Sequence, residues 1–297
     1  MKEATIKHNH LKRRHFLKTA LAGAIAAPAL CALDALAIEP HWVELVEQPL
    51  PLPNLPDAFL GRRLVQISDL HCSRVVSADY LNSCIDRVNQ LAPDAVLLTG
   101  DYITYEGRNG YPAQVIDVIG RLRAGLGICA GLGNHDYGFL TRFHQAGRAD
   151  LCQTLVEGLS ACGVHVLRNR ATPLTLDGKR LWIVGLGDLW SNNFQPDLAF
   201  RQVPAHEPAV ALSHNPDTID ALASFPAGAV LCGHTHGGQI NIPFFGPPFL
   251  PIKNRLYYAG MFSVAGKRLY VNRGLGRLGR LRFNCRPEIT LFTLTRA

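Results

Sequence analysis

The chain has 297 residues, of which 47% are hydrophobic and 18% are charged, so it can bury the core of one large domain or two small ones. Its formal net charge is +7, but residues 1–37 hold six Lys or Arg against two acids and contribute +4 of it. The remaining +3 does not support the basic surface field that nucleic-acid-binding proteins carry.

The N-terminal segment has the parts of an export signal in order. Arg13-Arg14 precedes Phe16-Leu17, an Ala/Leu-rich run of about 15 residues and an Ala35-Leu36-Ala37 cleavage site. The run is shorter than the ~20 residues needed to cross a bilayer. The segment resembles a twin-arginine (Tat) signal peptide. We expect residues 1–37 to be that signal or an uncleaved anchor, with the Tat translocase as a partner and the periplasm or the outer face of the inner membrane as destination.

Four prolines between residues 49 and 56 disfavour a helix, and residues 38–61 are expected to form an extended linker to a domain over residues 62–297. In the first half of that domain, short apolar runs alternate with segments of helical periodicity. The expected strands are 62–68, 95–99 and 127–132, and the expected helices are 79–91, 112–122 and 150–162. This alternation predicts parallel strands covered by helices.

The second half is richer in strands than the first. The expected strands are 164–167, 173–176, 180–185, 209–213, 229–232, 239–242, 259–264, 269–272 and 288–293. The eight cysteines form no CxxC pattern, and Cys129 and Cys232, which lie in apolar runs, are expected to be small buried hydrophobes. The expected architecture is two packed sheets flanked by helices.

Five polar clusters each follow a strand-like run. They are Asp69-Leu70-His71, Gly100-Asp101, Gly133-Asn134-His135-Asp136, Ser213-His214-Asn215 and Gly233-His234-Thr235-His236-Gly237. Ligands of open α/β sheets bind where strands end, so strands that are distant in sequence can bring all five clusters to one edge. Imidazole and carboxylate groups without cysteine suit two divalent ions such as Mn, Fe or Zn.

The spacing within the clusters favours shared coordination. Asp69 and His71 are two residues apart, as are His234 and His236, so an extended backbone would point the members of each pair the same way. Asp101 follows a glycine, which permits a tight turn. The two oxygens of its carboxylate make Asp101 the natural bridge between two ions.

The order D-x-H, G-D, G-N-H-D, H and G-H-x-H resembles the calcineurin-like metallophosphoesterase family over residues 62–294. The resemblance implies an α/β fold, a four-layer α/β/β/α sandwich, and hydrolysis of a phosphodiester or pyrophosphate bond. It is closest to a bacterial branch whose members often carry a Tat or membrane leader. That branch has the longer ending GHTHGGQ (here 233–239), a Pro/aromatic loop (242–248) and an Arg-Gly-Leu-Gly segment (273–276).

The family's roles carry over by position. One ion would be held by Asp69, His71, Asp101 and His236, and the second by Asp101, Asn134, His214 and His234. The resemblance gives His135 a contact with the phosphate and the leaving group, and gives Asp136 the task of orienting that ring. Two such ions can hold a hydroxide for in-line attack. No protein nucleophile is then needed, and the chain contains no G-x-S-x-G.

The substrate is indicated less sharply than the chemistry. Phe244 and Phe245 lie in an apolar loop just after the GHTH cluster, and residues 253–286 contain nine Lys or Arg and no acid. An apolar lip beside a cationic wall fits a lipid-linked phosphate at a membrane surface, with Phe244, Phe245 and Arg273 as substrate contacts. A core-packed loop and a solvated basic face explain the same pattern equally well.

Three other functions remain as alternatives. Some relatives resemble UDP-2,3-diacylglucosamine pyrophosphatase of lipid A synthesis, whose substrate is cytosolic, whereas a Tat signal directs export. A nuclease would need a basic track with stacking aromatic residues, which only residues 253–286 offer. A non-catalytic scaffold would be expected to lose metal ligands or His135, and this chain keeps all of them.

The twin-arginine assignment predicts where a variant accumulates. Changing Arg13 and Arg14 to Lys should leave the protein in the cytosol, because the translocase recognises the arginine pair rather than its charge. Subcellular fractionation with immunodetection measures the distribution. Lys2→Arg/Lys7→Arg, two conservative changes outside the motif, is the matched control and should be exported normally. Normal export of the Arg13/Arg14 variant would reject the assignment.

Overall fold

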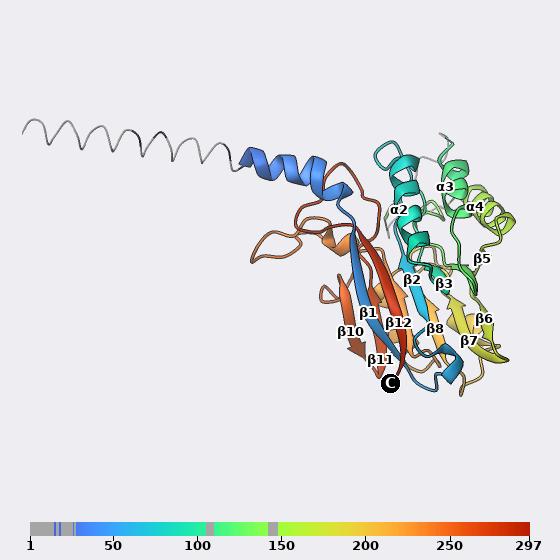
Figure 1. Cartoon of the computed structure of the whole chain (residues 1–297). Helices are drawn as coiled ribbons and strands as arrows, with labels where there is room; N and C mark the ends of the chain where they lie inside the picture. The colour runs from blue at the N-terminus through green and yellow to red at the C-terminus, as the bar shows by residue number, and fades with distance from the viewer. Residues whose placement is uncertain (1–14, 16–17, 19–25, 27, 105–109, 142–147) are drawn as a thin grey trace, which may run out of the picture.

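The computed structural model describes residues 15, 18, 26, 28–104, 110–141 and 148–297. Arg13, Arg14, Phe16 and Leu17, on which the export signal depends, lie outside the described residues. Within the described part, two six-stranded sheets pack face to face between layers of helices (Figure 1). No helix among these residues is long and apolar enough to cross a membrane.

The first sheet has the strand order β1-β12-β2-β3-β4-β5. Its strands are β1 (Glu44–Leu52), β12 (Glu288–Arg296), β2 (Arg63–Ile67), β3 (Ala95–Leu98), β4 (Gly127–Ala130) and β5 (His165–Val166). Neighbouring strands are parallel, except that β12 and β2 are antiparallel. The carboxyl ends of β2, β3 and β4 therefore lie at the same edge of the sheet.

The second sheet has the order β10-β11-β9-β8-β7-β6. Its strands are β10 (Gly260–Val264), β11 (Lys267–Val271), β9 (Ala229–Cys232), β8 (Ala209–Leu212), β7 (Lys179–Gly185) and β6 (Arg170–Leu176). The two outer pairs are antiparallel, and the strands from β11 to β7 are parallel. As in the first sheet, the central strands end at a common edge.

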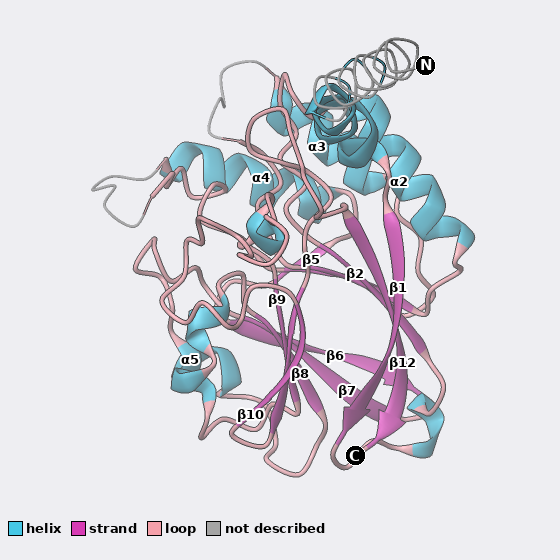
Figure 2. Cartoon of the chain, turned by 90° about the vertical axis from the view of Figure 1, so that its left-hand side faces the viewer, coloured by secondary structure: helices cyan, strands magenta, loops and turns pink. Residues whose placement is uncertain are grey.

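Apolar side chains fill three interfaces between four layers. Helices α2 (Ala78–Gln90), α3 (Tyr111–Gly120) and α4 (Ala149–Ala161) cover the first sheet, and α5 (Pro196–Phe200) packs against the second (Figure 2). Strand β2 shows the alternation that this requires, since Val65 faces the helices and Leu64 faces the other sheet. The predicted α/β/β/α sandwich is confirmed, and the three predicted helices begin and end within two residues of the expected bounds.

Two expected elements differ from the structure. The stretch 38–61, expected to be a linker, contains β1, which pairs along its whole length with β12. Pro49 and Pro51 did not prevent this, because β1 is an edge strand and proline is accepted where its missing N–H would face away from the neighbour. Residues 239–242, expected to be a strand, make only isolated bridges through Ile240 and Ile242.

The segment before β1 is fixed to the loop that follows β11. The buried carboxylate of Glu39 accepts hydrogen bonds from the backbone N–H groups of Asn284, at 2.7 Å, and Cys285. The guanidinium of Arg286 lies 4.0 Å from the centre of the Trp42 ring. Residues 39–42 therefore belong to the folded body rather than to a free leader.

Candidate functional site

All five polar clusters begin where a strand of the two sheets ends. The strands β2, β3, β4, β8 and β9 stop at Ile67, Leu98, Ala130, Leu212 and Cys232. The two sheets are tied at this edge by the buried amide of Gln66, which donates to Thr99 Oγ1 at 3.1 Å and to the Cys232 carbonyl at 2.9 Å. Side chains of three of the clusters line one cavity of about 840 Å³, and side chains of the other two clusters contact these lining residues.

Asp101 lies at the centre of the convergence. Its Oδ2 is 3.1 Å from His214 Nε2, 3.5 Å from His71 Nε2 and 4.0 Å from His135 Nε2. Its Oδ1 accepts the backbone N–H of His135 at 2.9 Å. One oxygen thus faces three imidazoles from three clusters, as the predicted bridging ligand would have to.

Asp69 lies beside a second pair of imidazoles, those of His71 and His236. Its Oδ1 lies 3.4 Å from His236 Nε2, and its carboxylate accepts the backbone N–H of His234 at 3.1 Å. His71 Nε2 and His236 Nε2 are only 3.0 Å apart, so the two ring nitrogens point at the same place. Two nitrogens and one carboxylate oxygen therefore surround a single point.

Hydrogen bonds to backbone carbonyls set which nitrogen His214 and His234 present to the site. His214 Nδ1 lies 2.8 Å from the carbonyl of Thr99 and donates to it, which turns Nε2 toward Asp101. His234 is held the other way round, because its Nε2 donates to the Pro251 carbonyl at 3.2 Å. Its Nδ1 then faces inward, 3.2 Å from His214 Nε2. Such outer partners orient metal-binding histidines.

Burial and neighbouring charges shift the pKa values of these groups in opposite directions. Burial, reinforced by nearby imidazoles, lowers the pKa of His71 and of His234 to about 3, so both rings are neutral. Burial also opposes the charge on Asp101, but His214 and His135 outweigh it and hold the pKa of that carboxyl well below its usual value. For His214, burial lowers the pKa and Asp101 more than reverses this, raising it to about 10. A proton on His214 thus supplies positive charge where a cation would.

Five of the predicted ligands have a left-handed backbone. The φ angles are +51° at Asp69, +48° at His71, +56° at Asp101, +71° at His234 and +52° at His236. Residues other than glycine rarely adopt this region, and such strain concentrates at functional sites. The expectation that an extended backbone aligns Asp69 with His71, and His234 with His236, is therefore wrong. Asp69 and His71 still meet in one ligand group, whereas His234 and His236 belong to different groups.

Two glycines of the clusters make room for the carboxylates. A Cβ atom on Gly133 would lie 2.2 Å from Asp101 Oδ1, and one on Gly233 would lie 2.2 Å from Asp69 Oδ2. Any side chain at either position would displace a predicted ligand. The glycines in G-N-H-D and G-H-x-H are thus explained by close packing against the site.

The donor atoms fit a divalent metal site. The described residues include three groups whose ligand atoms lie within 4.8 Å of one another: Asp69, His71 and His236; His71, Asp101 and His135; and Asp101, His214 and His234. Asn134 Oδ1 is buried without a hydrogen-bond partner, while Asn134 Nδ2 donates to the Phe139 carbonyl at 2.6 Å. An unpartnered buried oxygen beside these groups suits a cation, and neutral imidazole with carboxylate and amide oxygen suits Mn, Fe or Zn.

Asp136 has a different task from the one expected. Its carboxylate accepts the backbone N–H groups of Asp101 and Tyr102, both at 2.8 Å, and of Gly133 at 2.9 Å. His135 Nδ1, which Asp136 was expected to orient, is buried and has no hydrogen-bond partner. Asp136 therefore locks the loops after β3 and β4 together and positions Asp101 through the backbone.

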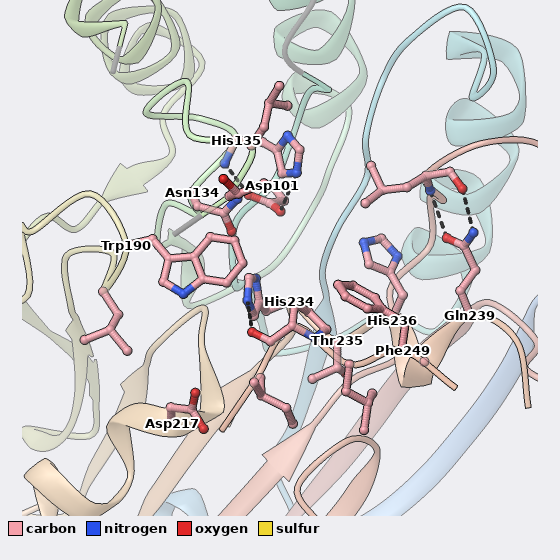
Figure 3. A pocket seen from close by; sticks show the side chains of 18 of the residues that line it. Asp101, Asn134, His135, Trp190, Asp217, His234, Thr235, His236, Gln239 and Phe249 are labelled. Carbon is pink, nitrogen blue, oxygen red and sulfur yellow. Dashed lines mark hydrogen bonds and ion pairs between the residues drawn. The ribbon is translucent and has the colours of Figure 1, made fainter. Parts of the chain in front are cut away.

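The cavity wall contains residues that the sequence analysis missed. Trp190 lies edge-on to His234, with ring centres 4.5 Å apart, and Asp217 lies lower in the wall (Figure 3). Asp217 accepts the backbone N–H of Lys253 at 2.8 Å and so anchors the segment after Phe249. The only signal for Trp190 was its place in a Gly-rich turn after a strand.

The residues expected to contact substrate lie outside the cavity lining. Phe244 and Phe245 are exposed, as their apolar loop predicted, but neither lines the cavity. Arg273 donates from Nε to Glu288, and from an outer nitrogen to Glu44 at 2.9 Å. Because Glu44 belongs to β1 and Glu288 to β12, Arg273 links these two strands and does not face a substrate.

Comparisons with known proteins agree with the geometry. The family model of the calcineurin-like phosphoesterases matches residues 62–238. The chain is 34% identical over 257 residues to phosphodiesterase YaeI of Escherichia coli, covering 86% of this chain and 90% of that protein. It is 35% identical over 292 residues to the metallophosphoesterase YkuE of Bacillus subtilis, covering 96% and 98%. It is 32% identical over 314 residues to UDP-2,3-diacylglucosamine pyrophosphatase LpxG of Chlamydia trachomatis, covering 90% and 94%.

The central position of Asp101 predicts different metal losses from two substitutions. Asp101→Asn should lose both ions, because it removes the negative charge shared by two ligand groups, whereas Asp69→Asn should empty mainly one site. Elemental analysis after gel filtration measures bound metal per chain. Asp117→Asn, at an exposed position of α3, is the matched control and should retain full metal content. Two ions retained in Asp101→Asn would contradict the bridging assignment.

His135 separates catalysis from metal binding. His135→Ala should keep its fold and metal content and lose about 10²–10⁴-fold in turnover, the range for a positioned acid–base group. His206→Ala, at an exposed histidine, is the control for a histidine change elsewhere. The competing hypothesis is that His135 binds metal together with His71 and Asp101, whose ligand atoms lie close to its own. In that case the metal content of His135→Ala should fall together with its turnover.

Proposed function

The chain belongs to the calcineurin-like phosphoesterase family and is a metal-dependent phosphoester hydrolase, and from this premise we propose that it cleaves a phosphodiester or pyrophosphate bond in a lipid-linked substrate. Two divalent ions, bound by the ligand groups around Asp69 and Asp101, would serve the reaction. The observation that carries the substrate class is the apolar wall of the cavity above those groups.

The cavity lining combines the polar cluster with many apolar side chains and with a few further polar ones, such as Asn192, Asp217 and Lys253. The polar cluster comprises Asp101, Asn134, His135, His234 and His236, which point into the space in Figure 3. The apolar lining of the cavity consists of Leu140, Leu189, Trp190, Ile240, Pro248, Phe249, Leu250, Pro251, Ile252 and Leu278. The volume of about 840 Å³ lies in the range of sites that enclose most of a drug-sized ligand. A small soluble phosphoester would leave that wall uncovered, whereas an acyl or isoprenoid chain would bury it at roughly 25 cal/mol per Å².

The chain's own groups have defined tasks in this reaction. When bound, the ions supply Lewis acidity toward the phosphoryl oxygens and lower the pKa of a coordinated water. Asp69, Asp101 and the inward-facing imidazoles hold the ions by charge and by fixed ring nitrogens. His135 reaches the same space from the loop after β4 and can donate a hydrogen bond to the leaving oxygen. Trp190 and Phe249 contribute apolar surface to the cavity lining.

The basic stretch 253–286 has fewer surface cations available to bind a polyanion than its composition indicates. Arg277 and Arg282 are buried and donate to backbone carbonyls, and Lys267 Nζ donates to the carbonyls of Phe225 and Ala227. Together with Arg273, four of its nine cations are thus used inside the fold. A nuclease would need those charges at the surface, so the structure favours the lipid-linked substrate over nucleic acid.

One relative supports a second candidate. LpxG is named as a UDP-2,3-diacylglucosamine pyrophosphatase, and such a substrate carries both a pyrophosphate and acyl chains. That candidate and the export proposal place the substrate on opposite sides of the inner membrane. Fractionation of the chain therefore bears on the substrate as well as on the leader.

Phe249 provides the test of substrate class. With manganese present, Phe249→Ser should lower kcat/KM for a lipid pyrophosphate about 10-fold relative to a small chromogenic phosphodiester, because one apolar contact of the wall is lost. Leu198→Ser, at an exposed position of α5 outside the cavity lining, is the matched control. Assays with an isoprenoid pyrophosphate, UDP-2,3-diacylglucosamine and single-stranded DNA separate the candidates. Equal loss on the lipid and the small ester, or preference for DNA, would contradict the proposal.

A further inference from the structure

We propose that residues 242–256, the docking loop, bind the surface of an anionic lipid bilayer and insert Phe244 and Phe245 into it. The inference goes beyond the chemistry of the cavity and does not depend on which phosphoester is cleaved. It rests on the shape of the loop, the exposure of its apolar side chains, its charge and its place beside the cavity.

The tip of the docking loop is a closed hairpin. Gly246 donates its N–H to the Ile242 carbonyl at 2.8 Å, and Ile242 donates its N–H to the Gly246 carbonyl at 3.1 Å. Phe245 N–H also reaches the Ile242 carbonyl, at 3.0 Å. Phe244 sits at the turn with φ +69°, a left-handed conformation that is unfavourable for an aromatic residue. The fold therefore holds two phenyl rings at the end of a strained, fixed projection.

The apolar side chains of the docking loop are unusually exposed. Phe244 is 106% exposed, Phe245 88%, Phe249 73% and Leu256 72%. These are the four most exposed large hydrophobic side chains among the residues that the structure describes. Concentrated exposure of this kind marks an interaction surface, whereas single exposed apolar residues do not.

The docking loop is already ordered before any partner arrives. Asp217 accepts the backbone N–H groups of Lys253 and Asn254, and Arg255 donates to the Pro247 carbonyl at 2.8 Å. At its far end, Thr235 Oγ1 donates to the Tyr258 carbonyl at 2.7 Å. Little conformational entropy is then lost on binding, so most of the gain from ring insertion is available for affinity.

Charge identifies the partner as an anionic surface. Lys253 and Arg255 are exposed within the docking loop, and the sequence contains no Asp or Glu from residue 221 to residue 287. Apolar rings flanked by cations match the acyl boundary and the headgroups of a bilayer that contains acidic lipid. The cations are few and the rings stand on a projection rather than on a flat face, which favours a bilayer over the complementary surface of a protein.

A second apolar segment lies on the same side of the molecule. The helical segment of residues 28–41 and the loop between residue 239 and β10 both project to the left in Figure 1. Leu30, Leu33 and Leu36 of that helical segment and the adjoining Trp42 are exposed, and the buried contacts of Glu39 fix its end to the body. Two segments remote in sequence, both with exposed apolar side chains, thus extend from the same side of the backbone in this view.

Docking in this orientation would bring the cavity to the bilayer. Phe249 is exposed to solvent and also lines the cavity, so the docking loop and the apolar cavity wall are continuous. A lipid in the bilayer could therefore place its phosphate near the histidine cluster without its chains crossing water.

Vesicle binding tests the surface directly. The full chain should co-sediment with vesicles of phosphatidylcholine and phosphatidylglycerol, and more weakly with phosphatidylcholine alone. Phe244→Ser/Phe245→Ser should lower the partition coefficient roughly 10-fold per ring. Leu60→Ser/Leu198→Ser, which removes two less exposed apolar side chains elsewhere, is the matched control and should bind as the unaltered protein does. Unchanged binding of the phenylalanine variant would overturn the proposal.

A fluorescent residue at the tip of the docking loop shows whether the chain binds vesicles through this loop or through another segment. Phe244→Trp should show fluorescence quenching by lipids brominated along the acyl chain, in excess of that shown by the unaltered protein. Absence of added quenching would overturn the proposal even if the chain binds vesicles. A third result would also overturn it. If the unaltered protein does not bind vesicles but self-associates in sedimentation velocity, and Phe244→Ser/Phe245→Ser abolishes this self-association, the loop joins two copies of the chain. Turnover of a small chromogenic phosphodiester by these variants separates failure of docking from failure of the phosphoesterase assignment.

Discussion

Two carboxylates buried among five imidazoles are the constraint on which the rest of the structure depends. Asp69 and Asp101 are almost wholly shielded from water, and burying ionised groups is costly unless opposite charge and hydrogen bonds compensate. Protonated His214 and backbone N–H groups supply part of that compensation. Divalent ions would supply far more, so the fold holds a site whose stability and whose chemistry have the same electrostatic cause.

The surroundings of the site follow from holding those carboxylates in place. Parallel strands in both sheets end at one edge, which lets short loops deliver ligands from five parts of the chain. Gly133 and Gly233 remove side chains where Asp101 and Asp69 need space. Asp136 uses three backbone N–H groups to fix the loops that carry Asp101 and His135. The loops that carry Asp101 and His135 are therefore held by buried hydrogen bonds to the backbone.

Much of this arrangement could be predicted from the sequence, because strand-like runs followed by His, Asp and Asn indicate the strands and the edge where their ends meet. The local backbone geometry of the site and the hydrogen bonds around it could not be predicted in this way. Five left-handed ligands depend on loop closure between distant segments, and no pattern marks Asp136 as a backbone clamp rather than a partner of His135. Strand β1 was hidden because its prolines indicate a linker unless the neighbour in the sheet is known. Trp190 carried no signal beyond its place in a turn.

The position of β12 has a consequence for how the chain folds. This last strand lies between β1 and β2, pairing in parallel with one and antiparallel with the other. Both partners come from the first quarter of the chain, so their ladders cannot close until the C-terminal residues have been synthesised. Long-range pairing of this kind slows folding and leaves strand edges open to association meanwhile. Removing the final strand would therefore destabilise the N-terminal strand, because β1 would lose its neighbour in the sheet.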